Sequence, residues 1–343
     1  MRGRRSTLWV RSLKNLITDI AGLRVGHADD ARLASGVTAI VFDKPAVAAI
    51  DVRGGGPGTR EDAALGLANT VDRIDGIALS GGSAFGLEAG GGVQAYLAER
   101  GRGFVVRDAV IPIVPGAICF DLLNGGDKAW GRFPPYRDLG YRAAAGAAVD
   151  FALGSVGAGL GASTATFKGG LGSASAKTPA GVTVGALVVV NAVGSVTIGD
   201  GPWFWAAPFE QDNEFGGRGL PPSFSSDMLK LRIKGGPTAT EAEATTLAVV
   251  ATDAALTKPQ AKRLAMIAQT GMARAIYPVH APLDGDLLFA VATGEKPVDP
   301  LVGLTELGMV AANALARAIA RGVFHATALS FPGALPAWKD RFG

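Results

Sequence analysis

The run from Thr178 to Gly199 contains no charged residue over 22 positions. Its length alone would allow a membrane span. It is, however, rich in valine and interrupted by proline, glycine and asparagine, a composition typical of buried strands. We therefore expect two buried strands, 182–190 and 195–198, with a turn near 192–194, and no membrane partner.

Strand and helix signals alternate through the rest of the chain. We expect further strands at residues 37–42, 46–52, 76–79, 246–252 and 287–293, and helices at 60–71, 85–100, 143–153, 257–273 and 304–321. The clearest helix start is Thr257-x-x-Gln260 with Pro259 in the first turn, a capping box. Strands that are apolar on both faces indicate sheets sandwiched between helix layers.

Composition narrows the classes of partner. Charged residues make up 18% of the 343-residue chain, below the roughly 25% of an average domain. This favours a surface partly covered by self-association. The net charge is only +3, and no basic block interleaves with aromatic residues, so nucleic acid is not expected as a partner. The single Cys119 excludes an intrachain disulfide framework and a cysteine-based zinc cluster.

Two segments of the chain differ in composition from the rest. Residues 1–14 are basic but lack the apolar stretch of a secretory signal. We interpret them as an extension before a single catalytic domain, 15–343, and expect a cytoplasmic protein, or a periplasmic one if the start is mis-assigned. Residues 199–244 are irregular and rich in proline, glycine and aromatic residues, a length of loop that is usually functional or mobile.

Several short motifs have simpler interpretations. Residues 81–86 (GGSAFG) resemble a nucleophile elbow, but Phe85 stands where the last glycine is needed, so a tight turn at a helix start is favoured. Such a turn can still offer backbone N–H groups to a carbonyl oxygen. A triad of Ser83, His280 and an aspartate is arithmetically possible, with no spacing that supports it. The three histidines, His27, His280 and His325, give no zinc spacing.

A more coherent set of polar residues surrounds the second half of the chain. Thr245 and Thr246 open an apolar strand directly after the irregular segment. Asp284 and Asp286 are two residues apart, so they share one face if the following strand begins there.

Two more polar residues interrupt apolar sequence. Lys168 stands in a glycine-rich stretch without other charges, and Asn191 interrupts a run of valines. Burying either costs free energy unless it has a partner. These residues together predict a site.

Three further stretches carry a family resemblance: 22–27 (GLRVGH), 51–60 (DVRGGGPGTR) and 79–87 (LSGGSAFGL). With the residues above, they resemble the DmpA-type aminopeptidases, which include L-aminopeptidase/D-esterases, β-peptidyl aminopeptidases and nylon-oligomer hydrolases. The resemblance runs from about residue 15 to about residue 331.

The resemblance implies an inactive precursor that cuts itself between Ala244 and Thr245, giving fragments 1–244 and 245–343. A free α-amine has a pKa near 7.7–8.0, suitable for a general base at neutral pH. On an N-terminal threonine it lies beside the hydroxyl, so one residue supplies nucleophile and base. The other family roles are as follows: Lys168 beside the nucleophile, Asn191 as oxyanion donor, Asp284 and Asp286 orienting the nucleophile or meeting the substrate amine, and Tyr136, Ser83 and Gly82 in the substrate pocket.

The implied architecture is a four-layer α/β/β/α sandwich of the DmpA and ornithine-acetyltransferase type, layered like N-terminal-nucleophile hydrolases. The implied activity is hydrolysis of N-terminal residues of short peptides, amides or esters through an acyl-enzyme on Thr245, without metal or organic cofactor, in a homotetramer. Relatives carry Asn or Gly before the scissile bond, and Ala244 lacks the freedom of glycine to adopt a positive φ. Two alternatives are an ornithine-acetyltransferase-like acyltransferase and a non-enzymatic assembly protein that has lost processing.

Overall fold

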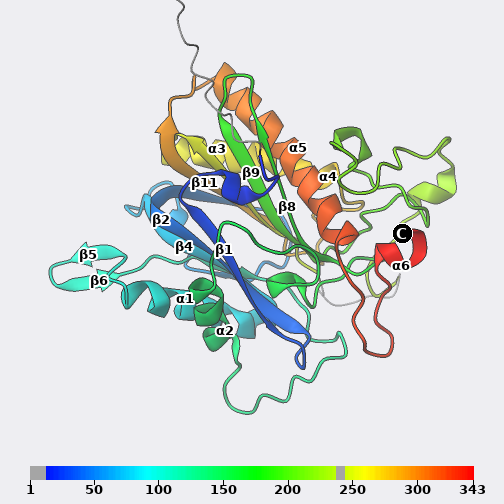
Figure 1. Ribbon diagram of the computed structural model, residues 1–343, viewed down its shortest axis with the longest axis horizontal. Coiled ribbons are helices and arrows are strands. Elements are labelled where there is room, and N and C mark those ends of the chain that lie inside the picture. The colour runs from blue at the N-terminus through cyan, green and yellow to red at the C-terminus, as the bar shows by residue number, and fades with distance from the viewer. Residues whose placement is uncertain (1–12, 237–243) are drawn as a thin grey trace, which may run out of the picture.

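The computed structural model describes residues 13–236 and 244–343 (Figure 1). Most of the predicted extension, residues 1–12, therefore lies outside the described part. The strands are β1 (Leu23–Asp30), β2 (Ser35–Val52), β3 (Thr59–Arg60), β4 (Arg73–Ser80), β5 (Phe104–Val106), β6 (Ala109–Ile111), β7 (Gly116–Ile118), β8 (Gly170–Lys177), β9 (Thr183–Val190), β10 (Leu247–Ala254) and β11 (Leu287–Lys296). The α-helices are α1 (Ala89–Ala98), α2 (Tyr136–Ala145), α3 (Lys258–Ala268), α4 (Thr270–Ala273), α5 (Val302–Phe324) and α6 (Trp338–Phe342).

The long strand β2 joins two halves of one mixed sheet. The strand order is β3-β7-β4-β2-β11-β10-β9-β8, with β1 paired to β2. The first half of β2 pairs with β1 and the second half with β11, while β4 runs along the other edge. The predicted strands 37–42 and 46–52 are thus one strand, with a register shift between Val41 and Ala46.

Three apolar clusters separate four layers. In β10, Ala248 and Val250 belong to a cluster shared with α3 and α5, whereas Leu247 and Val249 belong to a cluster shared with β1, β2 and β4. A third cluster joins the outer face of β2 and β4 to α1 and α2. Figure 1 shows α3 and α5 on one side of the strands and α1 and α2 on the other. The predicted α/β/β/α layering is confirmed.

Helix α5 is the one helix among the described residues with the length and apolar composition of a membrane span. Its residues pack on β8, β9 and α3, and most of them are buried. These contacts are those of the core helix of a globular domain.

Two predicted helices are wrong because tertiary contacts override helix propensity. The region 60–71 forms only a single 3₁₀ turn, Asp62–Leu65, closed by a hydrogen bond from the Gly66 N–H to the Ala63 carbonyl. The ammonium of Lys258 in α3 binds the carbonyls that follow, those of Ala64, Asn69 and Val71. The alanine-rich region 143–153 continues α2 only to Ala145, because the chain then pairs Ala148 with Val25 of β1.

Two other predictions are confirmed only in part. The predicted strand 195–198 makes isolated bridges, Ser195 to Tyr277 and Thr197 to Phe204, because loops rather than strands lie beside it. The predicted helix 85–100 begins as a 3₁₀ turn and becomes α1. The capping box of α3 is confirmed, with the Thr257 hydroxyl accepting from the Gln260 N–H.

Candidate active site

Thr245 lies where three strands of the sheet meet at one end. Asn191 directly follows β9, Thr245 precedes β10, and Asp284 and Asp286 precede β11. Because β9 is antiparallel to β10 and β10 is parallel to β11, the end of β9 and the starts of the other two coincide. The Thr245 N–H donates to the Asn191 carbonyl at 2.8 Å. All four residues are at most 3% exposed, so an external substrate does not reach the hydroxyl in the uncleaved chain.

The carbonyl of Ala244 accepts two hydrogen bonds. Thr245 Oγ1 donates to it at 2.5 Å, and the Gly285 N–H donates at 3.1 Å. A Cβ on Gly285 would lie 2.5 Å from Thr245 Oγ1, which shows how closely this glycine approaches the hydroxyl. The hydroxyl is therefore held at the carbonyl group of the Ala244–Thr245 peptide bond, and the Gly285 N–H is a backbone donor that supports charge on the carbonyl oxygen.

The two carboxylates differ in how completely they are bound. Asp286 Oδ1 accepts from the Thr246 N–H at 2.8 Å, and its Oδ2 accepts from the His280 N–H at 3.1 Å and lies 3.0 Å from His280 Nδ1. Asp284 Oδ1 accepts from the Val193 N–H at 3.2 Å, whereas its Oδ2 is buried with no hydrogen-bond partner among the described residues. Burial and, second, the charge of Asp286 raise the pKa of Asp284 to about 7. Asp284 is therefore able to exchange a proton near neutral pH.

The Asn191 amide has a fixed orientation. Its Oδ1 accepts from the Ser163 N–H at 3.0 Å and from Lys234 Nζ at 2.8 Å, and its Nδ2 donates to the Phe120 carbonyl at 2.9 Å. The two donors that the structure places on the Ala244 carbonyl are the Thr245 hydroxyl and the Gly285 N–H. The oxyanion role of Asn191 stays a prediction.

Lys168 is buried and donates to three carbonyls, those of Gly159, Ala162 and Gly169, at 2.7–3.0 Å. It makes no hydrogen bond to Thr245 in the part of the chain that the structure describes. Burial lowers the pKa of Lys168 to about 7, while three acceptors favour the ammonium, which alone carries three hydrogens. Because Ser163 follows Ala162, Lys168 orders the loop that contacts Asn191.

Tyr136 and Gly82 belong to a neighbouring cluster around Asp121, and the Ser83 N–H donates to the Cys119 carbonyl at 3.0 Å. The Tyr136 hydroxyl donates to Ser35 Oγ at 3.1 Å, Ser35 Oγ donates to Asp121 Oδ2 at 2.6 Å, and the Gly82 N–H donates to Asp121 Oδ1 at 2.7 Å. Gly82 has a φ of +82°, and a Cβ there would lie 2.1 Å from the Tyr136 ring. The GGSAFG motif is therefore a turn packed against a tyrosine. It connects to the site through Phe120, which precedes Asp121.

Three residues at or next to the site were not assigned a role from the sequence: Gly285, Lys234 and Asp121. His280 was considered only for a triad with Ser83, and its Nδ1 lies 3.0 Å from Asp286 Oδ2. Gly285 stands between the two predicted acids, and the spacing of these acids was the sequence feature that could have identified it. Asp121 directly follows a buried apolar run, which predicts a partnered carboxylate. Lys234 lies in the irregular segment, where no periodicity marks a single residue.

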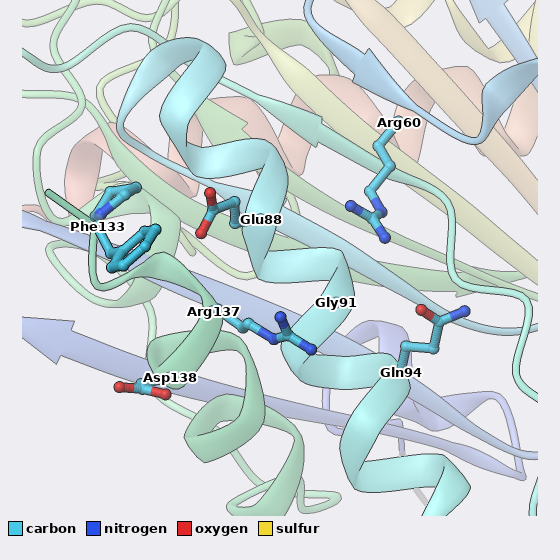
Figure 2. Close-up of a pocket in the computed structure, with 8 residues that line it drawn as sticks. Arg60, Glu88, Gly91, Gln94, Phe133, Arg137 and Asp138 are labelled. Carbon is cyan, nitrogen blue, oxygen red and sulfur yellow. The ribbon is translucent and has the colours of Figure 1, made fainter.

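A separate pocket lies between α1 and α2. It has a volume of about 550 Å³, and Arg60 and Arg137 flank Gly91 on its wall (Figure 2). None of the predicted site residues lines it. Across residues 13–236 and 244–343, no group of three or more His, Cys, Asp or Glu side chains is arranged to hold a metal ion.

Comparison with known proteins gives a consistent result. An uncharacterised aminopeptidase of Mycobacterium tuberculosis is 42% identical over 347 residues, covering 96% of this chain and 98% of that protein. A 6-aminohexanoate-oligomer endohydrolase of Paenarthrobacter ureafaciens is 31% identical, covering 87% of this chain and 80% of that protein.

Solved structures support the fold. A β-aminopeptidase of Burkholderia sp. superposes with a TM-score of 0.66 at 24% identity, over 94% of this chain and 90% of that one. The L-aminopeptidase D-Ala-esterase/amidase of Ochrobactrum anthropi, described as a variant of the Ntn-hydrolase fold, gives 0.63 at 19% identity, over 93% and 88%. The profile of peptidase family S58 matches residues 15–334. The chain is therefore a peptidase that belongs to family S58, the family of the DmpA-type aminopeptidases.

Proposed function

We propose that the chain is the precursor of an aminopeptidase or amidase that cuts itself between Ala244 and Thr245 and then uses Thr245 as an N-terminal nucleophile. The observation that carries the proposal is the contact between Thr245 Oγ1 and the carbonyl of the preceding residue, with the Gly285 N–H on the same oxygen. The hydroxyl is thus held against the carbonyl group that it would attack.

Self-cleavage follows as an N-to-O acyl shift. Thr245 Oγ1 forms a bond to the Ala244 carbonyl carbon, and the Gly285 N–H stabilises the developing oxyanion. The hydroxyl proton passes to a carboxylate of the Asp284 and Asp286 pair, and from there to the Thr245 nitrogen as the C–N bond breaks. Water then hydrolyses the resulting ester, which leaves a carboxylate on Ala244 and restores the hydroxyl. The base in this step cannot be the α-amine, because that nitrogen is still an amide.

Turnover repeats the chemistry with a different base. After cleavage, the α-amine of Thr245 takes the hydroxyl proton during attack on an N-terminal peptide, amide or ester bond. The substrate carbonyl occupies the position that the Ala244 carbonyl has in the precursor. The acyl-enzyme on Thr245 is then hydrolysed by water.

The deciding experiment follows the purified chain over time on a denaturing gel. We expect two fragments, the smaller beginning Thr-Thr-Leu by N-terminal sequencing, and hydrolysis of amino-acid p-nitroanilides that rises with cleavage. Thr245→Ala should remove cleavage and hydrolysis, and Thr245→Ser, which keeps a hydroxyl, should retain both. Full activity in a chain that stays in one piece would refute the proposal, because that chain has no free α-amine at Thr245.

The same preparation separates the alternatives. Transfer of an acetyl group from acetylornithine to glutamate would support the acyltransferase interpretation. A single band without hydrolysis after prolonged incubation would support a non-enzymatic protein. The family assignment favours the hydrolase.

A further inference from the structure

Lys234 lies ten residues before the scissile bond and is held in place by its own backbone. Its N–H donates to the Val193 carbonyl at 2.8 Å, and the Gly236 N–H donates to the Ile233 carbonyl at 3.0 Å, which closes a turn around it. The preceding Arg232 forms an ion pair with Asp200 at 3.1 Å. These contacts fix the base of the Lys234 side chain beside the end of β9.

The Lys234 ammonium fixes the Asn191 amide. An ammonium and a backbone N–H only donate, so the atom that both Lys234 and Ser163 contact must be the amide oxygen of Asn191. The carbonyl of Asn191 in turn accepts the N–H of Thr245, whose nitrogen is the leaving group of the proposed cleavage. A single residue, Asn191, therefore connects the Lys234 ammonium to the peptide bond that breaks.

The backbone of Lys234 is also connected to Asp284. Val193 joins the two residues, since its N–H donates to Asp284 Oδ1 and its carbonyl accepts from the Lys234 N–H. Asp284 is fully buried, and burial and Asp286 raise its pKa, whereas Lys234 lowers it. The ionised form of the Asp284 carboxylate is favoured by backbone hydrogen bonds from Val193 and Ala281 and by the charge of Lys234. Burial and the charge of Asp286 disfavour it.

We propose that Lys234 is a positioning residue for self-cleavage: its ammonium fixes the Asn191 amide next to the scissile nitrogen, and its backbone, through Val193, holds Asp284, the carboxylate that accepts the Thr245 hydroxyl proton. The inference rests on the proposed self-cleavage, and it concerns the step in which no free α-amine is present. The segment before the scissile bond would then take part in self-cleavage and would not only connect two parts of the chain.

The test measures the rate of self-cleavage against pH in full-length chains made by cell-free synthesis. Lys234→Met removes the charge at similar size, Lys234→Gln removes it with a polar group, and Lys234→Arg keeps it. We expect the pH midpoint of cleavage to rise in the two neutral variants, because Lys234 lowers the pKa of Asp284. Their rate should therefore fall below that of the wild type at pH 7 and approach it at pH 9. Lys234→Arg should restore the wild-type midpoint.

Lys230→Met is the matched control, because Lys230 lies in the same segment but is exposed and pairs only with Asp227 among the described residues. It should cleave like the wild type. The inference is overturned if both neutral variants cleave at the wild-type rate, or if they slow equally at every pH, which a purely structural role would produce. If the wild-type chain itself does not cleave, the proposed function fails and the inference fails with it. If the wild-type chain cleaves and the Lys234 variants cleave equally well, only this inference is overturned and the proposed function stands.

Discussion

Substitution of Gly285 by alanine tests the geometry of the scissile carbonyl directly. Gly285 does not have a positive φ, so alanine is compatible with its backbone conformation and only the added methyl group matters. That methyl carbon would lie 2.5 Å from Thr245 Oγ1 and 2.7 Å from the Gly56 carbonyl oxygen, where ordinary contact begins at 3.4 Å. The hydroxyl would therefore have to move by about 0.9 Å to restore ordinary contact.

A displacement of this size has a large kinetic effect. A misplacement of about 1 Å costs roughly 10²-fold in rate, equivalent to about 2.7 kcal/mol of activation free energy. We expect Gly285→Ala to lengthen the half-time of self-cleavage about 100-fold on a denaturing gel. Gly146→Ala is the control, because a methyl group there lies 3.5 Å from its nearest neighbour, the Arg142 carbonyl. A folded Gly285→Ala chain that cleaves within threefold of the wild-type rate would refute the geometry.

Three further predictions concern stability and assembly. In a Thr245→Ala background, Asp284→Asn should raise the melting temperature more at pH 8 than at pH 4. Because the pKa of Asp284 is raised, the folded state keeps a proton that the unfolded state loses near pH 4, so the free energy of unfolding falls as pH rises to about 7. An equal rise in melting temperature at both pH values would contradict this. Lys168→Met should lower the melting temperature by about 5 °C or more in calorimetry, because three buried carbonyls lose their donor; an unchanged melting temperature would show that those carbonyls find other donors. The β5–β6 hairpin exposes Phe104 (63%) and Val105 (61%), so serine at both positions should reduce the mass of the predicted homo-oligomer in light scattering, and an unchanged mass would exclude the hairpin from the interface.

The sequence predicts those features in which a local pattern coincides with burial. The valine-rich segment around 182–190 is β9 because both of its faces are covered, and Thr257 with Gln260 begins α3 through a bond between residues three apart. The alanine-rich 143–153 region fails because Ala148 bonds to Val25, more than 120 residues earlier, and no local pattern encodes that pairing.

The candidate site shows the same division. Burial cost alone indicates that Lys168 and Asn191 need partners. It does not identify the three carbonyls around Lys168, since these lie in a loop whose path depends on the packed sheet. Gly285 is separated by 40 residues from Thr245, and only the parallel pairing of β10 with β11 places its N–H on the Ala244 carbonyl.

The structure also explains why precursor and mature enzyme need different bases. In the uncleaved chain the Thr245 nitrogen donates to the Asn191 carbonyl as an amide and has no basic lone pair. The groups with accessible protons near pH 7 are then Asp284 and Lys168, both buried and both with a pKa of about 7. Of these, Asp284 has an acceptor oxygen without a described partner, whereas Lys168 is committed to three carbonyls. Cleavage creates an amine at Thr245, and the neutral form of that amine is the base for turnover. Self-cleavage should therefore follow the titration of a carboxylate with a pKa near 7, and turnover that of an amine, so the two rates should have different pH profiles.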